Sequence, residues 1–517
     1  MGYNGHIDYS NEGAMQMRRC LSWLIAVVLL ATCASALGEG TADPAGRFTM
    51  AGLDDASTNH DWESNMFFRR MEERTGISFI FDQYGERKAW EEFKLNMGVR
   101  NTELPDVLFK ADLTPRETQD WYEKGILIDL RPYLEEHAPN LMILLQGHPE
   151  WREAITLPDG AIVALPNFNE LQNNNAMWIN TAWLQELGLD MPSTADELTE
   201  TLRAFKTLDP NRNGRRDETP LTFTGMWDLR YLGHAFGLVS NDYYVIAEDG
   251  EVSSILTTDE NRAFLAWLNQ LWQEGLIDQM GFSSLDTTRR ITDKDAVMTY
   301  GIFMGPTPMN MVPADSMNQY SALLPLTYDG RQVYRDLTGD VVLGAFAITS
   351  ECDDPAALVR WVDFLYTEEG CHLAQAGLEG EDFVFNEDGT WDWVEEPEVV
   401  ATTVMADVTI ADGGAAPGYS SLDFQLHFDD HDTHRLVTEL QAVKQCAVLP
   451  YPIRYLTAEK EARIAALQAE IAPYAEQQMI WFVTGDVPLN DETWDEFCRT
   501  LTEKGLDEMV ALWQEAL

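Results

Sequence analysis

The chain has 517 residues, of which 86 are acidic and 35 are basic, so its formal net charge is −51. Such an excess of negative charge repels the phosphate backbone, and we expect no nucleic-acid partner. Hydrophobic residues make up 45% of the chain and 16 residues are tryptophan, which excludes a disordered acidic polymer and predicts a large core.

The first 36 residues have the pattern of a signal peptide and leader. Met17-Arg18-Arg19 precedes an apolar run over 21–31, which is too short for an ordinary membrane span. We therefore expect export to an extracellular or periplasmic location. Two processing routes stay open: cleavage at the small-residue site Ala34-Ser35-Ala36, or lipidation of Cys33 as a membrane anchor.

Short apolar strands and amphipathic helices then alternate. The pattern predicts strands over 48–53, 77–81 and 105–109, with helices over 62–74, 88–97 and 114–125. Gly76 is placed to end the first helix. This βαβαβ order predicts a mostly parallel sheet covered on both faces.

A second alternating unit begins near Ala176, and the tract Asn173-Asn174-Asn175 before it has the polarity of a crossing between units. The C-terminal end is predicted to be helical. Apolar residues recur there at spacings of three and four, which is typical of a buried stripe; they are Ile464, Leu467, Ile471 and Tyr474.

The cysteines that follow the leader are Cys352, Cys371, Cys446 and Cys498. None forms a C-x-x-C pair, and no His lies nearby at metal-binding spacing. Disulfides and free thiols both remain open for these residues.

The most specific short motif is the loop 209–218. Oxygen-bearing side chains occupy positions 1, 3, 5 and 9, and glycine occupies position 6, which is the spacing that wraps Ca²⁺. The predicted ligands are Asp209, Asn211, Asn213, the carbonyl of Arg215, Asp217 and Glu218. Pro220 stands where a bidentate Glu is usual, so Glu218 must supply the last oxygens. The competing interpretation is a turn without metal.

The sequence contains no motif of a known catalytic mechanism. There is no glycine-rich phosphate loop, no G-x-S-x-G and no H-E-x-x-H, so nucleotide binding, serine hydrolase chemistry and zinc protease chemistry have no support. Paired carboxylates are uninformative among 86 acidic residues. A secreted polysaccharide-degrading enzyme, a glycosidase or lyase, therefore remains the alternative hypothesis.

Aromatic residues near predicted loops are candidates for sugar binding, because an indole face stacks on the C–H face of a pyranose. The candidates are Trp62, Trp178 and Trp227, together with Asn174 in the polar tract. For each Trp, burial in the core is the competing interpretation.

Several segments together resemble the extracellular solute-binding proteins of carbohydrate ABC transporters, in the lipoprotein branch that includes alginate-oligosaccharide-binding members. Each segment alone is weak, but their order and spacing are specific. They are Leu157-Pro158-Asp159-Gly160, 164–166, Met177-Trp178-Ile179-Asn180, 183–189, 192–194, 197–198, the loop 209–218, 482–486 and 505–508.

The resemblance implies a non-enzymatic receptor with two α/β lobes, a hinge and an inter-lobe cleft. One lobe is expected to comprise 45–172 with 345–410, and the other 173–344 with 411–517. The protein would act as a monomer that captures an oligosaccharide and delivers it to the membrane permease. Structural Ca²⁺ in the loop 209–218 and sugar stacking by Trp178 and Trp227 are also implied. The charge of −51 favours a neutral sugar over an alginate-like anion.

Overall fold

The computed structural model describes residues 46–99, 103–170, 175–283, 298–309, 311–336, 338–396 and 399–517. The chain divides into the units Met1–Gly46 and Arg47–Leu517, and all the helices and strands named below belong to the second. The predicted signal peptide 1–36, with Cys33, and the candidate Asn174 lie outside the described residues.

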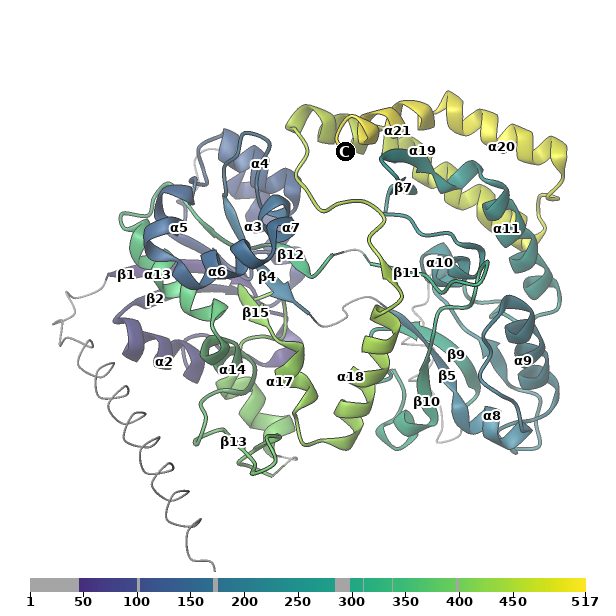
Figure 1. Cartoon of the computed structure of the whole chain (residues 1–517), viewed down its shortest axis with the longest axis horizontal. Helices are drawn as coiled ribbons and strands as arrows, with labels where there is room; N and C mark the ends of the chain where they lie inside the picture. Colours follow the sequence, from purple (N-terminus) through teal and green to yellow (C-terminus); the bar gives the residue numbers. More distant parts are fainter. Residues whose placement is uncertain are drawn as a thin grey trace, which may run out of the picture. The chain divides into compact units, whose positions relative to one another are not determined.

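A six-stranded sheet contains the predicted N-terminal strands (Figure 1). Its order is β15 (Gly418–Ser420), β4 (Ala164–Asn169), β12 (Val341–Ile348), β3 (Val107–Phe109), β1 (Arg47–Leu53) and β2 (Ser78–Tyr84). Strand β1 is parallel to β2 and β3, as the βαβαβ order predicted. Strand β12 enters between β3 and β4 and is antiparallel to both.

Strand β15 lies in a different sheet from the one that the sequence indicated. The segment 411–517 was assigned to the second lobe, yet Gly418 pairs with Asn167 in a parallel ladder with β4. The assignment is wrong for β15, because a three-residue strand after a run of glycine and alanine carries no periodic signal. The remaining lobe boundaries stay a prediction.

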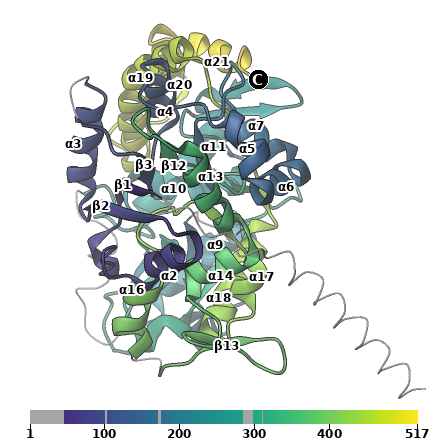
Figure 2. The same ribbon diagram turned by 90° about the vertical axis from the view of Figure 1, so that its left-hand side faces the viewer.

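The first helix beside this sheet, α2 (Met66–Thr75), begins and ends at recognisable caps. Asn65 caps its N-terminus, and Gly76 ends it with a φ of 71°, as predicted. Helix α3 packs against β1 and β2 (Figure 2). The helices around this sheet are α2 (Met66–Thr75), α3 (Arg87–Met97), α4 (Pro115–Glu123), α5 (Arg131–His137), α6 (Pro139–Gly147), α7 (Pro149–Ala154), α13 (Pro355–Asp363), α14 (Glu368–Ala376), α16 (Met405–Val408) and α17 (Leu422–Leu426).

A four-stranded sheet contains Ala176, where the sequence predicted that a second series of alternating strands and helices begins. Its order is β10 (Tyr320–Leu323), β5 (Ala176–Asn180), β9 (Tyr300–Gly305) and β6 (Thr219–Leu221). Strand β5 is antiparallel to both of its neighbours. The accompanying helices are α8 (Thr181–Leu187), α9 (Ala195–Thr207), α10 (Gly225–Gly233), α11 (Asp259–Gln273) and α18 (His431–Lys444).

The first of three C-terminal helices packs on α11, and the other two pack on the first. The three are α19 (Ala458–Thr484), α20 (Asp491–Glu503) and α21 (Leu506–Gln514). Ile464, Leu467 and Ile471 are buried in one core with Leu268 and Leu271 of α11, which confirms the predicted stripe. Among the described residues, no helix combines the length and the apolar character needed to cross a membrane.

Short elements connect these layers. Three two-stranded ribbons pair β7 (Val245–Glu248) with β8 (Glu251–Ser254), β11 (Tyr334–Arg335) with β16 (Ala447–Val448), and β13 (Phe383–Phe385) with β14 (Trp391–Trp393). Short segments of 3₁₀ or π helix are η1 (Ala56–Thr58), η2 (His234–Phe236), η3 (Ile255–Thr257), η4 (Ala314–Gln319), η5 (Phe364–Tyr366) and η6 (Val400–Val404). Cys352, Cys371, Cys446 and Cys498 are free thiols.

Candidate functional site

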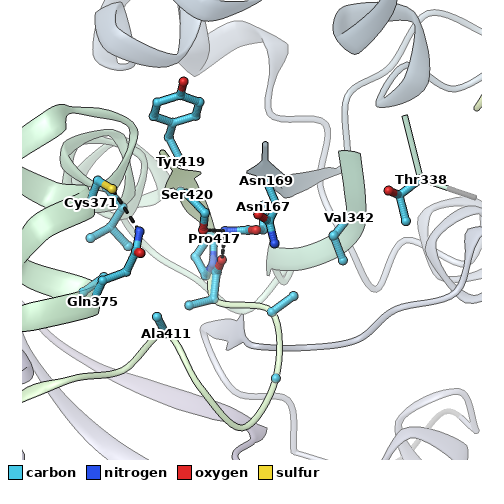
Figure 3. Close-up of a pocket in the computed structure, with 16 residues that line it drawn as sticks. Asn167, Asn169, Thr338, Val342, Cys371, Gln375, Ala411, Pro417, Tyr419 and Ser420 are labelled. Carbon is cyan, nitrogen blue, oxygen red and sulfur yellow. Dashed lines mark hydrogen bonds between the residues drawn. The ribbon is translucent and has the colours of Figure 1, made fainter. Parts of the chain in front are cut away.

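A pocket of about 390 Å³ opens where β4 and β15 pair, and we call it the β4–β15 pocket. Asn167 and Asn169 lie between the α14 side chains and the segment that carries Thr338 and Val342 (Figure 3). It is lined by Asn167, Asn169, Thr338, Val342, Leu365, Cys371, Ala374, Gln375, Ala411 and 414–420. Every lining side chain is uncharged, so the pocket offers hydrogen bonds without a net charge.

The register of β4 against β15 sets the polar groups of this pocket. Phe168 is buried and stacks on Trp151 at 4.4 Å, and strand alternation turns its neighbours Asn167 and Asn169 to the pocket side. The Asn167 side-chain amide donates to the Ala416 carbonyl at 2.9 Å. The amide is therefore held in one orientation.

Two ionisable groups on the pocket wall remain protonated at neutral pH. Burial raises the pKa of the Cys371 thiol to about 11. Burial also raises the pKa of Tyr419, and its hydrogen bond to the Glu170 carboxylate adds to the shift. Both groups are therefore protonated, and the Tyr419 hydroxyl donates its proton to Glu170.

The loop that leads into β15 is fixed by a buried ion pair. Lys110 Nζ lies 2.8 Å from Asp54 Oδ2, with both side chains inaccessible to solvent, and it also donates to the Asp412 carbonyl. Gly413 has a φ of 77°, and an added Cβ would lie 2.3 Å from Asp54 Oδ1. The ion pair thus positions the segment that forms one wall of the pocket.

The pKa values of this pair reflect burial and mutual attraction. Burial raises the pKa of Asp54, but hydrogen bonds from His60, Lys110 and Trp62 outweigh that effect, and the net shift is below the ordinary value. Burial lowers the pKa of Lys110, and Asp54 opposes this shift. The carboxylate is the stable form of Asp54 in this environment.

Trp62 belongs to that buried cluster and is not a sugar platform. It is 1% exposed, its Nε1 donates to Asp54 Oδ2 at 2.8 Å, and its ring meets Phe81 and Phe109 edge to face. The prediction of a ligand-binding Trp62 is wrong because Asp54 satisfies the indole inside the core, where the ring is excluded from solvent.

Trp178 is likewise a core residue. It is 0% exposed and its Nε1 donates to the Gly305 carbonyl at 2.9 Å. It packs with Phe303 and Tyr320, while its neighbours Met177 and Ile179 face a separate core. Both faces of β5 are covered, so the prediction of a solvent-facing Trp178 is wrong.

Trp227 is the predicted platform that remains accessible. It lies in the first turn of α10 and is 43% exposed. The guanidinium carbons of Arg230 and Arg335 lie 5.2 and 5.4 Å from the centre of its ring. These cation–π contacts hold the indole in place while part of it faces solvent.

The loop 209–218 has the turn that its spacing predicted. Both Asp209 carboxylate oxygens accept backbone amides of the loop, from Asn213 at 3.1 Å and Gly214 at 3.0 Å. The two oxygens of Glu218 are buried and have no hydrogen-bond partner among the residues that the structure describes. Burial raises the pKa of Glu218, and Asp217 and Asp209 add to the shift.

A cation is the natural partner for the unpaired Glu218 oxygens, so the loop fits a metal in this respect. Among the described residues, however, no three His, Cys, Asp or Glu side chains are grouped closely enough to hold one. A metal site in this loop would therefore also need the side-chain oxygens of Asn211 and Asn213 and the Arg215 carbonyl as ligands. Such oxygen ligands suit a hard cation.

Comparisons with known proteins show what this chain resembles. No family model matches it. It is 26% identical over 475 residues to a fructooligosaccharide ABC transporter substrate-binding protein, FusA, from Streptococcus pneumoniae, covering 88% of this chain and 87% of FusA. It is also 36% identical over 204 residues to lipoprotein LipO of Bacillus subtilis, covering 38% of each chain.

Solved structures of other proteins superpose on this chain over nearly its whole described length. FusA of S. pneumoniae in complex with kestose superposes with a TM-score of 0.73 at 24% identity, covering 91% of this chain and 98% of FusA. An extracellular solute-binding protein from Bifidobacterium longum subsp. infantis gives a TM-score of 0.76 at 22% identity, covering 92% and 98%. The chain has the two-lobe α/β fold of solute-binding proteins.

The resemblance seen in the sequence is therefore confirmed. FusA is named as a substrate-binding protein of an ABC transporter for fructooligosaccharides, and the Bifidobacterium structure as an extracellular solute-binding protein. One FusA structure is described as an EF-hand mutant, which places a loop of the calcium-binding type in a relative. The β4–β15 pocket was not predicted from the sequence, because part of its wall is the small-residue segment 411–418, which has the composition of a linker.

Proposed function

We propose that this protein is the extracellular substrate-binding component of an ABC importer, which captures a neutral oligosaccharide and delivers it to the permease. The observation that carries the proposal is the β4–β15 pocket, whose lining offers amide, hydroxyl and thiol groups but no charge. Sugar hydroxyls need such donors and acceptors, and a uronate would need a cation.

Calorimetry against a glycan panel tests this function. The panel contains neutral fructo-, manno-, galacto- and malto-oligosaccharides, with alginate and polygalacturonan oligomers as anionic counterparts. We expect binding of one neutral class and none of the anionic ones. Tight binding of a peptide, with no response to any glycan, would contradict the proposal.

Trp227 is proposed as a sugar-stacking residue. Trp227→Ala is expected to weaken glycan binding by roughly 1–3 kcal/mol, by analogy with stacking of bases on aromatic side chains. Because 43% of the residue is exposed, the melting temperature should change little. Trp227→Phe keeps a smaller face and should lose less affinity. Unchanged affinity in the alanine variant would contradict a sugar-stacking role for Trp227.

We also propose that the loop 209–218 holds a structural Ca²⁺. An ion that binds only the folded loop stabilises the protein according to its free concentration. Wild-type protein should therefore melt at a lower temperature in chelator than in Ca²⁺, whereas Asp209→Ala should melt at a low temperature in both. Glu251→Ala removes an exposed carboxylate on β8 and should keep the chelator response. An identical wild-type melting temperature in both conditions would contradict the site.

The leader and the state of the mature protein belong to the same proposal. The predicted export through 1–36, with either cleavage or lipidation of Cys33, would place the receptor outside the cytoplasm. A monomer is expected, as is the absence of a nucleic-acid partner, because of the charge of −51.

A further inference from the structure

A second depression of about 490 Å³ lies beside the β4–β15 pocket, and we call it the outer groove. Tyr419 lines both. Helix α14 also contributes to both, with Cys371 and Gln375 in the first and Glu368 and His372 in the second. In the close-up of the β4–β15 pocket, the Tyr419 ring points away from Asn167 and Gln375 (Figure 3), so it forms the boundary between the two hollows.

Stacked aromatic rings form part of the outer groove. The His372 ring stacks on Phe424 at 4.1 Å, and Phe424 stacks in turn on Trp391 at 4.5 Å with an interplanar angle of 3°. Phe385 of the β13–β14 ribbon contacts His372 nearly edge on, at 5.7 Å, and is 41% exposed. Phe424 is buried between its two neighbours, so the rings of Phe385 and His372 present the aromatic surface of the groove to a ligand.

Polar groups complete the lining. Glu368 and Asp423 are exposed carboxylates, and the His427 ring lies within 2.8 Å of the Asp423 carbonyl. Aromatic faces beside carboxylate oxygens suit a ligand that is apolar on one face and hydroxylated at its edges. A wholly apolar partner would leave these carboxylates without hydrogen bonds, which is costly.

We propose that the outer groove is a distal subsite for the same oligosaccharide, which receives sugar units that extend past Tyr419 from the β4–β15 pocket. This inference rests on the proposed function. The two hollows share Tyr419 and helix α14, and neither is lined by a Lys or Arg side chain, so one neutral chain can be bound in both. The protein should therefore bind longer oligosaccharides more tightly than short ones of the same linkage.

The test is a calorimetric length series. Ladders of two to seven units, built from β-fructose, β-mannose, β-galactose or α-glucose, are titrated into wild type and Phe385→Ala. We expect affinity to rise along one ladder, and the variant to lose roughly five- to tenfold for the long members only, in line with one stacking contact. Val384→Ala is the matched control, because Val384 is exposed on the same ribbon but does not line the groove.

The outcomes separate the two proposals. If short sugars bind but long ones bind no more tightly, or if Phe385→Ala behaves as Val384→Ala, the outer groove is not a subsite while the transport function stands. If no ladder member binds, both proposals are overturned. Glu368→Gln gives an independent second variant, whose loss should again be confined to the long members, and melting curves establish that each variant is folded.

Discussion

Replacement of Trp178 by alanine is expected to lower the free energy of unfolding by about 3–5 kcal/mol, the usual cost of truncating a buried Trp. The side chain is fully enclosed between Phe303 and Tyr320, so its removal leaves a cavity. The same change removes the indole N–H that donates to the Gly305 carbonyl. A denaturant or thermal melt measures this loss.

Trp227→Ala is the natural control for Trp178→Ala, because the two residues differ chiefly in burial. We expect a large fall in stability for Trp178 and a small one for Trp227. Affinity should show the reverse order once the fraction of folded protein is corrected for. A Trp178 variant that melts as wild type but binds sugar weakly would contradict the core assignment.

Lys110→Met is expected to cost about 3–5 kcal/mol of stability, because it leaves the Asp54 carboxylate buried without its cation. Lys124→Met is the matched control: Lys124 pairs with Asp120 on the surface, with both side chains over 40% exposed, and such pairs contribute at most about 1 kcal/mol. Equal melting temperatures of the two variants would contradict a central role for the buried pair.

The double variant Asp54→Asn with Lys110→Met separates charge from packing. It should be more stable than Lys110→Met alone, since no uncompensated charge remains.

The contribution of Asp54 to the free energy of unfolding depends on pH with a defined sign. The folded pKa of Asp54 is depressed, so its stabilising contribution is present above the unfolded value of about 3.9 and is lost as pH falls through the folded pKa. Variants with Asp54→Asn should lack that component of the acid transition.

Local patterns predicted the elements that carry their own signals. The parallel order of β1, β2 and β3 followed from alternating strands and helices, the end of α2 from Gly76, and the stripe on α19 from its apolar spacing. The failures concern partners that are distant in sequence. The side chain of Trp62 is buried because Phe109, which is distant in sequence, packs against its ring, and no local pattern reports such a contact.

Trp178 shows how a usable signal can be outweighed. Ala176, Met177, Trp178 and Ile179 form a continuous apolar run, which is typical of a strand buried on both faces, yet the polar tract before it favoured an exposed position. The β4–β15 pocket has a weaker signal in the sequence than Trp178 has. Its wall contains glycines and alanines, whose composition is typical of a linker. The wall also depends on the ion pair between Asp54 and Lys110, which lie more than 50 positions apart.

The six-stranded sheet also sets an order for folding. Its strand β4 ends at Asn169, but the strands on either side of it, β12 and β15, come from residues 341–348 and 418–420. Pairings across such sequence separations form late and slowly. Until Ser420 has been synthesised, β4 has an open hydrogen-bonding edge, and such edges recruit other chains. A partner that shields that edge during synthesis would therefore reduce aggregation more than one that binds the finished protein.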